Sequence, residues 1–134
     1  MAEPATGSMA LHGERDIVMS RQQVRRLTQE LKFSLVDQTK MITAASELSR
    51  NTVVYGGGGE MRWEMLQQDG RAGLRLHFED RGPGIPDVEL ALTDGWTSGT
   101  GMGVGLSGSR RLVNEFELHT VVGQGTRVTV TRWK

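Results

Sequence analysis

The chain has 134 residues, and sixteen Lys and Arg residues balance sixteen Asp and Glu residues, so the formal net charge is zero. Its length and its 37% share of hydrophobic residues indicate one ordinary globular domain. The balanced charge gives no reason to expect nucleic acid or a membrane as partner. The sequence contains no cysteine, which excludes disulfides and thiolate chemistry, and no signal-peptide core, so we expect a cytoplasmic protein.

Secondary-structure signals in the first half predict a strand and two helices. Residues 1–8 are small and polar, and we expect a disordered tail or a cloning remnant there, ahead of a single domain over residues 9–134. A first strand is predicted near Met9–Leu11. Helical spacing of apolar residues follows over Ile17–Phe33. Ser34 is a plausible N-cap for a second helix that runs to Arg50 or beyond, until four glycines from Gly56 stop it.

The second half has the pattern of strands around a long loop. Apolar and polar residues alternate over 61–66 and 74–79, with the turn signal Asp69-Gly70 between them, which predicts a hairpin. Residues 82–103 are predicted to be mostly loop, with a short helix near Val88–Leu92. A third helix is predicted from Val104 to Phe116, followed by closing strands over residues 118–122 and 126–133. We therefore expect an α+β fold, a two-layer sandwich with a mostly antiparallel mixed sheet and helices on one face.

Glu47 and Asn51 form the first candidate site. They are four residues apart in the second predicted helix, so they share one face of it. The asparagine carbonyl oxygen is a suitable ligand for Mg²⁺, and the glutamate carboxylate can take a proton from an attacking hydroxyl. Taken alone, such a pair fits a solvated helix face better than an active site.

The second candidate is the segment Asp80-Arg81-Gly82-Pro83-Gly84-Ile85, which directly follows a predicted strand. A carboxylate at a strand end can accept a hydrogen bond from an adenine amino group. Glycines at positions 82 and 84 would let the backbone close over a base. On spacing alone, a tight turn around Pro-Gly is an equally good interpretation.

The third candidate is the glycine-rich stretch Gly99–Leu106 at the start of the third predicted helix. Backbone amides there can hold phosphates, helped by the positive end of the helix dipole. Apolar residues between the glycines argue against a flexible linker. The spelling G-x-G-x-x-G over Gly103–Gly108 lacks a preceding strand and a following βαβ unit, so a dinucleotide-binding fold is rejected.

Together, and in this order, these segments resemble the motifs of the GHKL ATPase family, which includes histidine kinases, Hsp90, gyrase and MutL. Glu47–Asn51 resembles its N box, and Asp80–Ile85 resembles its first glycine box. Gly101–Leu106 resembles the second glycine box, and Gly125-Thr126 resembles the closing G-T element. The resemblance implies the Bergerat ATP-binding fold.

The resemblance also implies a role for each matching position, with ATP and Mg²⁺ as cofactors. Glu47 would be the catalytic general base, and Asn51 would bind the metal. Asp80 would read the adenine amino group. The other nucleotide-binding residues would be Gly82, Gly84, Ile85, Gly101, Met102, Gly103, Val104, Gly105, Leu106 and Thr126. A lid would extend over residues 87–100, and Arg110 and Arg111 would face either the phosphates or a partner.

A narrower resemblance extends from about Asp16 to Trp133. The stretches Asp94–Gly99 and Arg110–Phe116 are similar to those of RsbT-type serine/threonine kinases of bacterial partner-switching systems. This implies a kinase that phosphorylates an STAS-domain antagonist of a stressosome-type pathway and, once released, activates a PP2C-type phosphatase. The alternatives are an anti-sigma factor kinase of the RsbW or SpoIIAB kind, which would bind a sigma factor, and a non-catalytic nucleotide-binding module. The intact Glu47 argues against the last.

Overall fold

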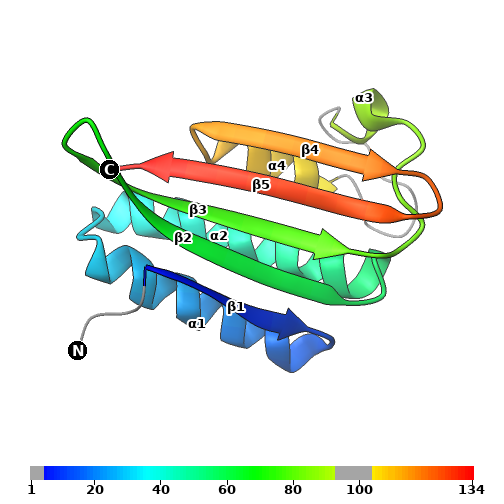
Figure 1. Ribbon diagram of the computed structural model, residues 1–134, viewed down its shortest axis with the longest axis horizontal. Helices are drawn as coiled ribbons and strands as arrows, with labels where there is room; N and C mark the ends of the chain where they lie inside the picture. The colour runs from blue at the N-terminus through cyan, green and yellow to red at the C-terminus, as the bar shows by residue number, and fades with distance from the viewer. Residues whose placement is uncertain (1–4, 93–103) are drawn as a thin grey trace.

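The computed structural model describes residues 5–92 and 104–134 of the chain. Five strands form one sheet in the order β1-β2-β3-β5-β4, and α1, α2 and α4 lie behind it in Figure 1. The elements are β1 (Thr6–Leu11), α1 (Glu14–Glu30), α2 (Leu35–Arg50), β2 (Gly59–Gln68), β3 (Arg71–Asp80), α3 (Val88–Ala91), α4 (Val104–Arg111), β4 (Glu115–Val121) and β5 (Gly125–Trp133). The predicted α+β sandwich with helices on one face is confirmed.

The expected mixed sheet is wrong, because every strand pair among the described residues is antiparallel. β3 and β4 run in the same direction, but they are not neighbours. The tight hairpin between β4 and β5 folds β5 back into the space between them, so β5 pairs antiparallel with both.

In the middle of the chain, the helix cap, the hairpin turn and the short helix form where the sequence predicts them. The Ser34 hydroxyl accepts a hydrogen bond from the Asp37 N–H at 3.1 Å and caps α2. The β2–β3 hairpin turns at Asp69 and Gly70, whose φ angles of 51° and 76° suit a tight two-residue turn. As predicted, a short helix, α3, begins at Val88.

Two predicted boundaries are wrong. β1 already begins at Thr6, so residues 6–8, which we expected in a tail, pair with β2, with Ser8 opposite Arg62. The backbone hydrogen bonds of an edge strand do not need apolar side chains, so polar composition hid this strand. The third helix ends at Arg111 rather than Phe116, which lies in β4 opposite Val130.

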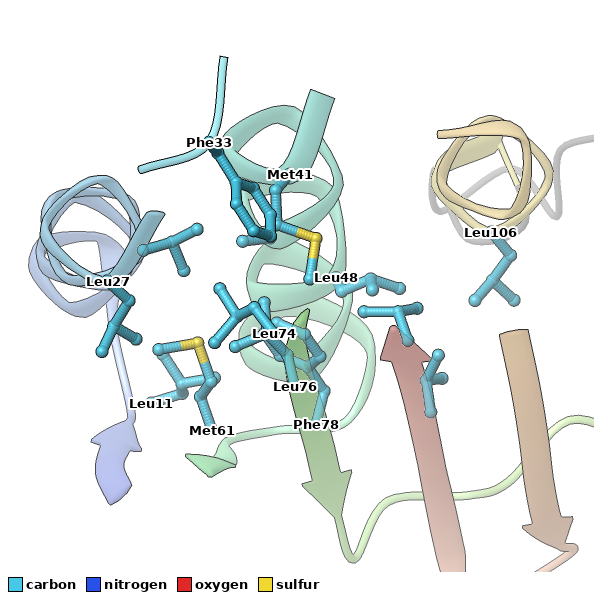
Figure 2. Close-up of a cluster of buried hydrophobic side chains, with 14 of the residues drawn as sticks. Leu11, Leu27, Phe33, Met41, Leu48, Met61, Leu74, Leu76, Phe78 and Leu106 are labelled. Atoms are coloured by element: carbon cyan, nitrogen blue, oxygen red, sulfur yellow. The ribbon is translucent and has the colours of Figure 1, made fainter. Parts of the chain in front are cut away.

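The hydrophobic core fills the space between the sheet and the helices (Figure 2). Leu27 of α1, Leu48 of α2 and Leu106 of α4 reach it from the helical layer, and each is at most 1% exposed. Leu76 of β3 meets them from the sheet. Burying one such side chain contributes about 1.5–3 kcal/mol. None of the helices within residues 5–92 and 104–134 is long and apolar enough to cross a membrane.

Candidate functional site

The end of α2 carries the first part of the site. The backbone does not leave the helix at Arg50 but widens into a π turn over Asn51–Tyr55, closed by the Gly56 N–H donating to the Asn51 carbonyl at 3.0 Å. Such turns often occur at functional sites, because they redirect the side chains that follow. The Thr52 hydroxyl donates to the Leu48 carbonyl at 2.9 Å and ties the turn back to α2.

Glu47 and Asn51 both retain unused hydrogen-bonding groups. The Nδ2 atom of Asn51 is buried and has no hydrogen-bond partner among the described residues. The partly buried carboxylate of Glu47 likewise makes no hydrogen bond or ion pair within the described part of the chain. A buried amide without a partner costs about 1–3 kcal/mol, so the Asn51 amide is a candidate for contact with a ligand.

Gly56 connects this helix end with the first glycine box. A Cβ atom on Gly56 would lie 2.4 Å from Cγ of Asp80, and one on Gly82 would lie 2.8 Å from Cα of Gly56. No side chain fits in either place, so the two backbone segments can approach only as glycines. The contact brings the turn that begins at Asn51 against the Asp80 carboxylate.

Asp80 is a partly buried carboxylate at the end of β3. Its Oδ1 atom accepts a hydrogen bond from the Gly82 N–H at 2.9 Å. Burial raises the pKa of Asp80 above its usual 3.8, and backbone N–H groups of Gly82 and Thr126 oppose that rise. A desolvated acceptor of this kind favours a ligand that donates hydrogen bonds.

The loop after Asp80 is held from two sides. Gly84 has a φ of 77°, and a Cβ atom there would lie 2.6 Å from the Val121 carbonyl oxygen, so both its conformation and its packing require glycine. The Tyr55 hydroxyl donates to the Gly84 carbonyl at 3.3 Å, and the Gly123 N–H donates to the Pro83 carbonyl at 2.8 Å. The π turn and the β4–β5 hairpin together fix this loop.

Thr126 completes the group from β5. It pairs with Asp80 across the sheet and is 7% exposed. Its hydroxyl is 2.9 Å from the hydroxyl of Thr120 in β4, which also accepts a hydrogen bond from the Ile85 N–H at 2.9 Å. The side chains of Asp80 and Thr126 and the first glycine box therefore belong to one connected cluster.

Residues 36–134 match the model of the histidine kinase-, DNA gyrase B- and HSP90-like ATPases. The chain belongs to this family, the GHKL ATPases. A curated relative, serine/threonine-protein kinase RsbT of Bacillus subtilis (strain 168), is 43% identical over 120 residues, which is 90% of each chain. The predicted GHKL domain is thus confirmed, and so is the predicted enzyme class of a protein serine/threonine kinase.

A solved structure shows the same fold. The RsbU and RsbW domains of Rv1364c from Mycobacterium tuberculosis align with 98% of this chain at a TM-score of 0.64 and 19% identity. The alignment covers 33% of that longer chain, and at this identity the likeness concerns the fold alone.

The described residues contain most, but not all, of the predicted GHKL site. Asn51 and Asp80 are connected through Gly56, as described above, and Gly82 and Thr126 lie beside Asp80. Gly84 and Ile85 follow in the same loop, where the Ile85 N–H bonds Thr120. Gly101, Met102 and Gly103 lie outside the described residues, as does most of the predicted lid. Val104 and Gly105 begin α4. Leu106 points into the core, so only its backbone is available to a nucleotide.

Three residues contact this candidate site without being predicted from the sequence to do so. The glycine cluster that begins at Gly56 predicts a helix stop and a sharp turn or a close backbone approach, but it does not predict the contact with Asp80. Tyr55 and Thr120 have no motif of their own, and only the fold brings them to the first glycine box.

Two cavities adjoin Asp80. One of about 610 Å³ lies between β1 and the glycine turn at residues 57–59, and one of about 350 Å³ lies beside the β4–β5 turn and includes Thr126. A third hollow, of about 410 Å³, lies on the uncovered face of the sheet. Several of its polar residues pair with one another, as Arg75 does with Glu115 at 3.6 Å, which is typical of a solvated sheet face.

Proposed function

We propose that this chain is an ATP-dependent kinase of a bacterial partner-switching pathway. Its substrate would be a serine or threonine of an STAS-domain antagonist in a stressosome-type assembly, and the released kinase would activate a PP2C-type phosphatase. The 43% identity to the kinase RsbT, spread over 90% of both chains, supports this most strongly. The aligned region is much longer than the nucleotide motifs alone.

The residues at the helix end fit Mg²⁺–ATP. The carbonyl oxygen of Asn51 is a hard ligand of the kind Mg²⁺ prefers, and its buried amide nitrogen still lacks a partner among the described residues. Asp80 and Thr126 would hold the adenine, and the start of α4 would face the phosphates. When bound, Mg²⁺–ATP supplies the phosphoryl group and the metal charge that its transfer requires.

Glu47 would act as the general base. Its carboxylate is partly buried, has no partner among the described residues, and lies one helical turn before Asn51 on the same face of α2. In this role it would take up the proton that the partner's hydroxyl loses as its oxygen bonds to the γ-phosphorus of ATP, while the bond from that phosphorus to ADP breaks. General bases of this kind typically contribute about 10²–10⁴-fold to the rate.

The partner proteins can be tested directly. The chain is mixed with radiolabelled ATP, Mg²⁺ and a purified STAS-domain antagonist, and Asn51→Ala serves as the inactive control. We expect label on a serine or threonine of the antagonist with the wild-type chain only. Tight binding to a sigma factor would instead favour an anti-sigma factor kinase. Nucleotide binding without any transfer would favour a non-catalytic module.

A further inference from the structure

The hydroxyl of Thr120 is a junction of three hydrogen bonds beside the first glycine box. It accepts from the Ile85 N–H at 2.9 Å, donates to the Gly125 carbonyl at 3.1 Å, and lies 2.9 Å from the hydroxyl of Thr126. No sequence motif contains Thr120. It joins the loop after Asp80 to the start of β5.

The direction of the third hydrogen bond follows from a count of protons. A hydroxyl has one proton and two lone pairs. The only proton of Thr120 goes to Gly125, because a carbonyl can only accept, and the Ile85 N–H occupies one lone pair. The Thr126 hydroxyl must therefore donate its own proton to Thr120, which leaves the Thr126 oxygen with lone pairs alone to offer a ligand.

The position of Thr126 makes this direction important. It lies opposite Asp80 in the β3–β5 register, and both residues line the same cavity of about 350 Å³. The Asp80 carboxylate, when ionised, is also a pure acceptor. Two adjacent acceptors favour a ligand whose facing edge carries a hydrogen-bond donor.

We propose that Thr120 is a positioning residue that fixes the Thr126 hydroxyl as an acceptor and thereby sets the preference for adenine over guanine nucleotides. This inference rests on the proposed function, because it assumes that Asp80 and Thr126 face the base. Adenine presents an amino group at the position where guanine carries a carbonyl oxygen. A carbonyl oxygen facing two acceptors leaves the lone pairs between them desolvated and without a donor, which disfavours guanine.

Without the Thr120 hydroxyl, the Thr126 hydroxyl loses its acceptor and can donate its proton to a ligand instead. In Thr120→Val, a side chain of the same shape, Thr126 can rotate and donate to a carbonyl oxygen, and the Ile85 N–H loses its acceptor. We expect ADP to bind about tenfold more weakly and the ratio of the GDP to the ADP dissociation constant to fall by about tenfold or more. Thr120→Ser keeps the hydroxyl and should restore both values to within about twofold of wild type.

The experiment is a calorimetric titration of the full chain with ADP and with GDP in the presence of Mg²⁺, since neither nucleotide can be turned over. Thr129→Val is the matched control, because the Thr129 hydroxyl bonds His77 at 3.0 Å on the opposite face of the sheet. Urea unfolding of every variant separates binding from stability. If Thr120→Val does not fold, Thr120→Cys replaces it, since a thiol is a weak acceptor.

The proposal is supported if the ratio of the GDP to the ADP dissociation constant falls about tenfold in Thr120→Val and stays at the wild-type value in Thr120→Ser and Thr129→Val. An equal loss of affinity for both nucleotides, or an unchanged ratio, would overturn it and reduce Thr120 to a structural residue, while the proposed function would stand. If the wild-type chain bound neither nucleotide, the proposed function itself would fail, and this inference with it.

Discussion

Replacing Gly56 by alanine should displace Asp80 together with its carboxylate. Gly56 has a φ of −77°, which alanine adopts freely, so the variant adds only a methyl group. That Cβ atom would lie 2.4 Å from Cγ and 2.5 Å from Oδ2 of Asp80. It would also lie 2.5 Å from the Cβ atom of Asp80, which is fixed to the backbone. Real Cβ atoms do not approach other atoms so closely, so the π turn and the end of β3 must move apart.

The expected magnitude follows from the contact that is lost. The Asp80 carboxylate accepts the Gly82 N–H at 2.9 Å, and a displaced carboxylate can neither keep this hydrogen bond nor meet the base. A hydrogen bond to a charged group contributes about 1.5–3 kcal/mol, which corresponds to about 10- to 150-fold in nucleotide affinity. The free energy of unfolding should also fall, because the end of β3 and the π turn can no longer pack as closely.

The assay is a titration of Gly56→Ala with ADP and Mg²⁺, accompanied by urea unfolding. Gly108→Ala is the control, since Gly108 is exposed in α4 and an added Cβ atom would meet none of the described residues within 4 Å. The control should bind ADP as wild type does, and its free energy of unfolding should be about 0.5–1 kcal/mol higher than that of wild type. A folded Gly56→Ala variant with wild-type affinity would refute the placement of the nucleotide against Asp80.

Two further predictions concern charged residues. Arg132 donates to Asp37 at 2.6 Å between β5 and α2, in a largely buried ion pair, so Arg132→Met should lower the free energy of unfolding by about 2–3 kcal/mol at pH 7 in urea titrations. The hydrogen bond from Arg132 lowers the pKa of Asp37 below its usual 3.8, so this stabilisation is present above about pH 4 and is lost as the pH falls through the lowered folded-state pKa. Acid unfolding should therefore be less steep in Arg132→Met than in wild type, and equal pH profiles would contradict this reasoning. Burial raises the pKa of Asp80, so the charged carboxylate lowers the free energy of unfolding at neutral pH. Asp80→Asn should therefore raise the Tm of the ligand-free chain. Its affinity for ADP should fall by about tenfold or more. A lower Tm in Asp80→Asn would show that burial of this carboxylate is not destabilising.

The elements that could be predicted from the sequence are those with local signals. Ser34 marks the start of α2 because its hydroxyl caps the first turn, and Asp69-Gly70 marks the hairpin because its backbone needs positive φ. The spacing of apolar residues alone misplaced the end of α4. Phe116 fits a helical repeat as well as it fits strand alternation, and only its pairing with Val130 decides between the two.

The candidate site could be predicted only where a motif carries it. Glu47, Asn51 and Asp80 were found because their residue types and order resemble those of a known family. The π turn after α2 has no sequence signature, so the contact between Gly56 and Asp80 was not foreseen. The site depends on tertiary contacts between segments far apart in the chain, and a single sequence does not record these.

The central claim is tested most directly by Glu47→Gln, which keeps the size and polarity of the side chain but removes the base. Phosphate transfer from radiolabelled ATP to the STAS-domain antagonist is measured beside the affinity of the same protein for ADP. We predict that transfer falls by about 100-fold or more while ADP affinity stays within about twofold of wild type. Transfer at the wild-type rate, or a loss of transfer fully explained by lost nucleotide binding, would contradict the assignment of Glu47 as the catalytic base of a kinase.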